Sequence, residues 1–141
     1  MPSRRASANG SRLVVPQKLG ELDDPGASIA QVRAYFDGLV RDLLSPEGRQ
    51  GCLLVNSAIE NAAADPEVAA VVRGHLARLE HCFTAALRTA IRLGEVPDSV
   101  NPVSRAKGLV AVSQGLMVVG KANPDEEVLR AIVDSAFAGL S

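Results

Sequence analysis

The chain has 141 residues, 15 basic and 16 acidic, and 47% of them are hydrophobic, which is enough for one domain with a substantial core. It has no Trp and only 3% aromatic residues, so the core is aliphatic, which favours packed helices over a β-sandwich. The net charge of −1 excludes the basic excess typical of domains that bind nucleic acid by themselves.

Residues 1–21 form a basic leader, which contains Arg4, Arg5, Arg12 and Lys18. One interpretation is a weak nucleic-acid arm. The other is a disordered, solvated tail or the remnant of a linking helix, which the Ser-, Ala- and Gly-rich composition favours. Residues 22–141 are expected to form a single domain.

Targeting and redox signals are sparse. The apolar run Leu13–Val15 is too short for a secretory signal. No stretch reaches the ~18 continuous apolar residues that a membrane span needs. Two cysteines, Cys52 and Cys82, do not make a disulfide framework, so we expect a cytoplasmic protein without membrane contact.

Helical periodicity predicts a first helix over Ser28–Leu44, and Pro46–Gly51 then interrupts the pattern. Cys52–Ala64 could start as a buried strand, but its continuation into three alanines favours a helix. The Asp65-Pro66 pair ends it and caps a long helix over Pro66–Leu93, followed by Gly94.

Two apolar helices complete the chain. Pro102–Gly120 is apolar nearly all round from Leu109, with small residues on one face, which fits either tight intrachain packing or a dimer interface. The last helix is expected to begin at Asn123-Pro124, with Asn123 and Glu126 as a capping box, and to extend to Leu140. Its broad apolar face favours a dimer. The fold class is therefore all-α, with five helices and no strand.

The sequence contains no motif for phosphate binding, zinc or acid–base catalysis. His75 and Cys82 share a helix face, and Cys52 could approach them, but their spacing matches no known metal site, so inert cysteines are favoured. Asn56 is either a structural amide or a polar group in a ligand pocket, and Gln114 and Tyr35 have the same ambiguity. We expect no enzyme activity and no cofactor.

The stretch Gly51–Ser57 (GCLLVNS), the turn Asp65–Val68 (DPEV) and the sequence Gly94-Glu95-Val96 occur in this order. Together they resemble the regulatory half of a TetR/AcrR-type transcriptional repressor, from about Leu22 to Leu140. The resemblance implies a domain that binds a small-molecule effector and forms a homodimer, with the last two helices of each protomer in an intersubunit four-helix bundle.

The position of each residue in that resemblance gives two sets of candidates. The effector pocket would be lined by Tyr35, Phe36, Val55, Asn56, Ile59, Leu79, Phe83, Gln114 and Met117. The dimer interface would contain Leu109, Val112, Leu116, Val119, Leu129, Ile132, Val133, Ala136 and Phe137.

Members of this family carry an N-terminal helix-turn-helix, whereas only 27 residues precede the first predicted helix here. The sequence shows no recognition helix, so DNA binding is expected only if such a domain is supplied. A truncated product, a wrongly assigned start and a stand-alone module all fit. The alternative function is a helical dimer that binds a small apolar molecule or forms inactive heterodimers with full-length relatives.

Overall fold

The computed structural model describes residues 19–61 and 63–141, without side-chain detail at positions 51–56, 58 and 59. This part of the chain contains five α-helices, one short 3-10 helix and no strand. The elements are η1 (Gly20–Asp23), α2 (Ile29–Leu44), α3 (Pro46–Asn61), α4 (Pro66–Arg92), α5 (Pro102–Ala122) and α6 (Glu126–Ala136). The all-α prediction is confirmed, and η1 is an addition that periodicity did not predict.

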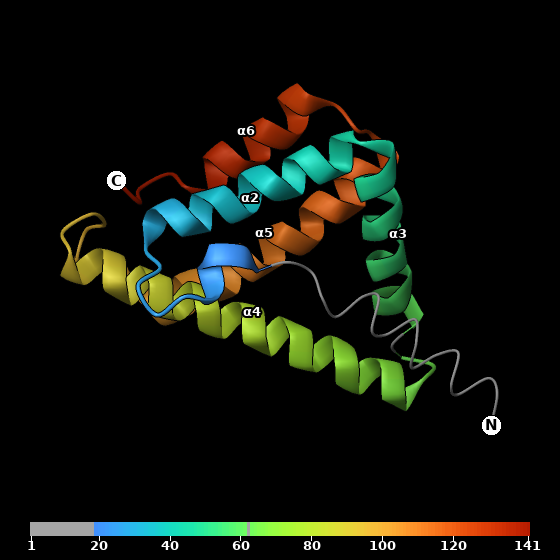
Figure 1. The fold of residues 1–141 in the computed structure, drawn as a ribbon, viewed down its shortest axis with the longest axis horizontal. Helices are drawn as coiled ribbons and strands as arrows, with labels where there is room; N and C mark the ends of the chain where they lie inside the picture. Colours follow the sequence, from blue (N-terminus) through green and yellow to red (C-terminus); the bar gives the residue numbers. More distant parts are fainter. Residues whose placement is uncertain (1–18, 62) are drawn as a thin grey trace.

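The helices α2 and α5 organise the bundle, because each of them packs against all the other α-helices. Figure 1 shows α6 beside α2 on one side, α4 along the other, and α3 crossing one end. The short η1 lies against α2 and α4. Every helix therefore has a buried side, and α5 lies against four neighbours.

Polar caps fix three of the helix starts where the sequence predicts them. The backbone N–H of Ser28 donates to Gln31 Oε1 at 2.8 Å, which begins α2. Asp65 Oδ1 accepts from the Glu67 backbone N–H at 3.0 Å, and Asn101 Oδ1 accepts from the Val103 N–H at 3.0 Å. Each acceptor satisfies a backbone donor that the first helical turn leaves without a partner.

The start of α3 differs from the prediction, which placed a break over Pro46–Gly51. The helix begins at Pro46, whose missing N–H is no loss in a first turn, and Ser45 Oγ accepts from the Gly48 N–H at 3.0 Å. A Cβ atom on Gly48 would lie 2.5 Å from the Asp42 carbonyl oxygen. The glycine therefore permits a close α2–α3 corner instead of ending the helix. At its other end, α3 stops at Asn61, before the predicted Ala64.

The boundary between α5 and α6 is also shifted. The predicted capping box of Asn123 and Glu126 is wrong, because Asn123 closes α5 and Asp125 caps α6. Asp125 Oδ1 accepts from the Glu127 N–H at 2.9 Å, and a carboxylate suits the positive helix end better than an amide does. The last helix ends at Ala136, so Leu140 is buried from a turn that contains Gly139 with a φ of 80°.

The chain has three Phe and one Tyr, and all four meet at one point of the core. Phe36 of α2 stacks on Phe83 of α4, with ring centroids 5.6 Å apart and planes at 12°. Tyr35 contacts both rings edge-on, and Phe137 contacts Phe36 edge-on. This aromatic cluster joins α2, α4 and the end of α6.

Replacing Phe83 with Ala is expected to lower the free energy of unfolding by about 3–5 kcal/mol, because Phe83 is fully buried and its loss leaves a cavity. Urea denaturation measures the change. Leu93→Ala, at a residue that is 60% exposed, is the control and should change stability by less than about 0.5 kcal/mol. Equal losses in the two variants would show that the aromatic cluster does not hold the fold.

Candidate functional site

Five of the nine predicted pocket residues belong to the hydrophobic core or pack against it. The side chains of Phe36, Leu79 and Phe83 are fully buried, and Met117 is nearly so. Tyr35 is half-buried against Phe36 and Phe83. The side chains of Val55, Asn56 and Ile59 lie outside the described part of the structure, so their role in a pocket remains a prediction. Gln114 differs from these residues because it has a polar amide whose oxygen atom is buried without a hydrogen-bond partner in the described part of the chain.

Gln114 belongs to a short chain of hydrogen bonds on α5. Ser113 is fully buried, and its hydroxyl donates to the Val110 carbonyl oxygen at 2.6 Å. The Gln114 amide nitrogen then donates to Ser113 Oγ at 3.0 Å. The amide oxygen, Gln114 Oε1, is buried and has no hydrogen-bond partner in the described part of the chain. Buried acceptors of this kind are uncommon in folded proteins.

A second polar group lies on α4, in the half of the helix nearest its N-terminus. His75 is only 8% exposed, and its Nε2 atom has no partner within the described residues. Burial, with the nearby Arg78 guanidinium as the smaller cause, lowers the pKa of His75 below the ordinary 6.5. The imidazole is therefore uncharged at neutral pH. From the sequence, His75 was considered only for a metal site, which was disfavoured, although its place between Val72 and Leu79 on an apolar stripe indicated burial.

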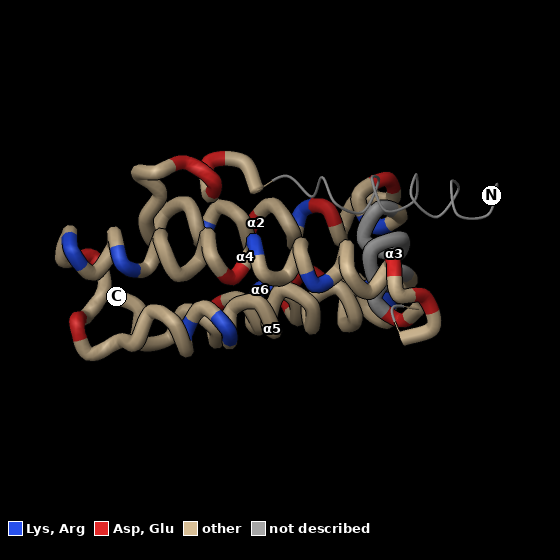
Figure 2. The backbone as a smooth tube through the Cα atoms, turned by 90° about the horizontal axis from the view of Figure 1, so that it is seen from below, with Lys and Arg blue, Asp and Glu red and all other residues tan. Residues whose placement is uncertain are grey.

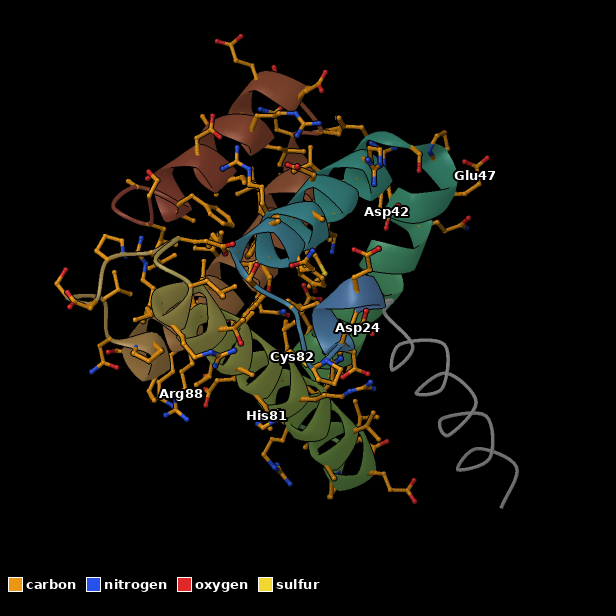
Figure 3. All side chains as sticks on the ribbon, turned by 60° about the vertical axis from the view of Figure 1, so that its left-hand side comes forward. Asp24, Asp42, Glu47, His81, Cys82 and Arg88 are labelled. Carbon is orange, nitrogen blue, oxygen red and sulfur yellow. The ribbon has the colours of Figure 1, made fainter. Side chains whose placement is uncertain are left out.

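Cys82 faces η1 on the same side of α4. Its thiol donates to Asp23 Oδ1 at 3.6 Å, and Arg78 pairs with Asp23 Oδ2 at 2.6 Å. Burial, followed by the Asp23 carboxylate, raises the pKa of the Cys82 thiol above 9.0, so the thiol stays protonated. Figure 3 shows Cys82 on the η1 side of α4, with His81 and Arg88 projecting outward. No group of three or more metal-binding side chains occurs among the described residues.

The nine predicted interface residues divide into two groups. Leu109, Leu116, Leu129 and Val133 are buried against their own chain and fasten α5 and α6 to the bundle. The remaining five are half-buried, namely Val112, Val119, Ile132, Ala136 and Phe137. The exposed apolar side chains on these two helices are instead Val103, Val118 and Val128.

The outer side of α5 is uncharged over most of its length. Its exposed residues recur at spacings of four and three, which aligns them in one stripe along the helix. We call this the outer stripe: Ser104, Gly108, Ala111, Gly115, Val118 and Ala122. Figure 2 shows the uncharged length of α5 between the cations at its two ends.

The cations of α5 are all paired inside the chain, away from the outer stripe. Arg105 donates to the carbonyl oxygens of Ala136 and Ala138 at 2.9 and 2.6 Å, which closes the end of α6. Lys107 pairs with Glu80 of α4 at 3.0 Å, and Lys121 lies 3.8 Å from Glu60 of α3. These contacts link α5 to α3, α4 and α6, and they leave its outer side uncharged.

Residues 28–136 match the family model described as the tetracyclin repressor-like C-terminal domain, so the chain belongs to this family, which is regulatory and not enzymatic. The resemblance inferred from the sequence is therefore confirmed.

One curated relative is an uncharacterized HTH-type transcriptional regulator, YezE, from Bacillus subtilis (strain 168). The two sequences are 30% identical over 120 residues, which cover 84% of this chain and 62% of the relative. No solved structure matches the chain. None of the helices in the described residues is long and apolar enough to cross a membrane.

The lowered pKa of His75 predicts how stability depends on pH. Below about pH 6.5 the unfolded chain binds a proton that the folded chain does not, so stability falls as the pH falls towards the folded-state pKa. Urea unfolding at about pH 7.5 and about pH 5.5 should show a smaller loss in His75→Leu than in the wild type. The control is His81→Leu, which removes an exposed histidine of the same helix. An equal loss in wild type and His75→Leu would contradict the assignment.

Proposed function

We propose that residues 22–141 form the effector-binding and dimerisation module of a TetR-like transcriptional regulator. Family membership supports the regulatory part of this proposal. The outer stripe of α5 supports the dimer, and it is the observation on which the proposal chiefly rests.

No contact within the described part of one chain requires glycine at positions 108 and 115 of the outer stripe. A Cβ atom at either position would meet nothing within 4 Å. Glycine in a helix interior is less stable than Ala by roughly 0.5–1 kcal/mol, so two exposed glycines weaken α5. A second helix that approaches closely along the stripe would account for both.

The second helix is best supplied by another copy of the same chain. Spacings of four and three match the pattern by which helices pack at shallow angles. The neighbouring α6 has exposed Val128, Ala131 and Ser135, which would extend such a contact. A two-fold axis beside α5 would pair α5 and α6 with their symmetry mates in a four-helix bundle. The half-buried Val112, Val119 and Ile132 flank this face.

Charge supports a module that does not recognise operator DNA by itself. Four of the 15 basic residues and none of the 16 acidic ones lie in residues 1–18, so residues 19–141 carry a net charge of −5. Such a module is repelled by phosphate backbones. In a complete regulator, an effector bound among the helices would change the spacing of two attached reader domains by a population shift. The same α5–α6 face would also accept a full-length relative, which gives the alternative function of an inactive heterodimer.

Gly115→Leu tests the dimer. Leu favours the helix more than Gly does, so the protomer should remain folded, whereas the larger side chain blocks a close helix pair. Sedimentation should show a wild-type dimer and a weakening of dimerisation by at least about tenfold in the variant. Gly74→Leu, on the outer side of α4 with equally open surroundings, is the control. A wild-type monomer, or a Gly115→Leu dimer as strong as the control, would refute the arrangement.

DNA binding is tested by fluorescence anisotropy with two labelled duplexes, one from upstream of the gene and one of shuffled sequence. Neither should bind in the micromolar range at about 0.15 M salt, because residues 19–141 carry a net charge of −5 and are repelled by the phosphates. Fusing a helix-turn-helix domain to the N-terminus is the positive control for a dimeric reader. Tight, sequence-specific binding by the unfused chain would disprove the claim.

A further inference from the structure

Only two side-chain atoms among the described residues are buried without a hydrogen-bond partner, His75 Nε2 and Gln114 Oε1. Burying a polar atom without a partner is unfavourable, so each of them needs a reason. They lie on α4 and α5, which pack against each other. Both helices also contact α3, so the two residues belong to helices that meet at the same end of the bundle.

The orientation of the Gln114 amide follows from its neighbour. The Ser113 hydroxyl has a single hydrogen, which it donates to the Val110 carbonyl oxygen. Ser113 Oγ can then only accept, so the amide group that faces it at 3.0 Å must be the nitrogen. The amide oxygen is consequently the buried, unpaired end of this hydrogen-bond chain. It can only accept a hydrogen bond, and a partner for it must be a donor.

His75 lies at nearly the same level of the bundle as Gln114. The ion pair between Glu80 and Lys107 sets the register of the two antiparallel helices. Five residues back from Glu80 along α4 is His75, and seven residues on from Lys107 along α5 is Gln114, in the same direction. At a rise of about 1.5 Å per residue, the two levels differ by about 3 Å.

The side chains next to both polar groups are apolar. His75 is flanked on its face of α4 by Val72 and Leu79, which are buried. Gln114 is followed one turn later by the buried Met117. The Arg78 guanidinium, which contributes to the lowered pKa of His75, is itself paired with Asp23 at 2.6 Å. A guest at this level therefore meets uncharged hydrogen-bonding groups in apolar surroundings.

We propose that His75 and Gln114 bind the polar end of the effector, and that this effector is a small, mostly apolar molecule with an uncharged hydroxyl or N–H donor. A carboxylate is disfavoured, because it would place a negatively charged oxygen against Gln114 Oε1, which can only accept a hydrogen bond. The proposal rests on the effector-binding function proposed above, since it assigns the chemistry that this function uses.

The test compares 2-naphthol with 2-naphthoate, which share a ring system and differ in the polar end. The chain has no Trp, so naphthalene fluorescence is read against a low background. We expect saturable binding of 2-naphthol at least about tenfold tighter than that of 2-naphthoate. Gln114→Met should weaken 2-naphthol binding by about five- to tenfold. The matched controls are Gln50→Met and His81→Leu, both at exposed positions.

A second measurement needs no ligand. If the two polar atoms are kept for binding, replacing them with apolar groups of similar size should raise the melting temperature of the free protein. Gln114→Met and His75→Leu should therefore melt above the wild type, and the two control variants should not. A lower melting temperature in both variants would show that these atoms stabilise the fold, and it would overturn the proposal.

Equal affinity for the two probes, or no saturable binding of 2-naphthol, would also overturn it. Sedimentation of the same samples separates this result from the proposed function. A monomeric wild type that still prefers 2-naphthol would refute the dimer while supporting the His75–Gln114 site. A dimer with no preference would do the reverse.

Discussion

The stack of Phe36 on Phe83 is the contact on which the rest of the structure depends. These rings use two of the chain's four aromatic side chains to join α2 to α4 at the centre of the core. Phe137 packs edge-on against Phe36 and carries the Arg33 guanidinium 4.9 Å above its ring. Arg33 also pairs with Asp134, so the end of α6 is held over α2. With α2 fixed in this way, α5 is enclosed on every side except its outer stripe.

Periodicity and caps predicted most of the fold, because both act within a few residues of chain. The stripe over residues 28–44 and the cap at Asp65 needed no tertiary information. The failures occurred where the sequence signal is ambiguous. Pro46 and Gly48 were interpreted as a break, yet proline suits a first helical turn and Gly48 is required by the close approach of Asp42. The partner of a buried polar atom depends on tertiary contacts, so sequence could name Gln114 but could not reveal its free oxygen.

Glycines on α5 show why composition alone left the role of this helix open. At Gly120 a Cβ atom would lie 2.9 Å from Leu43, so this glycine serves packing inside the chain. At Gly108 and Gly115 a Cβ atom would meet open space. In the sequence the three glycines cannot be told apart. Only their structural surroundings distinguish the glycine that serves intrachain packing from the two on a surface suited to a second copy. Intrachain packing therefore accounts for the side of the helix with Gly120, and the dimer interface remains our proposal for the side with Gly108 and Gly115.

The inner and outer sides of α5 belong to one continuous helix, so they move together. Gln114 directs its polar end inward, and its neighbour Gly115 lies on the outer stripe. The proposed guest on the inner side would displace or fix a helix that also forms the proposed dimer face, and small displacements matter where backbones pack closely. If the guest changes the dimerisation constant by some factor, linkage requires that dimerisation change the affinity for the guest by the same factor. Because Gln114 and Gly115 are consecutive residues of one helix, this coupling would need no pathway beyond α5 itself.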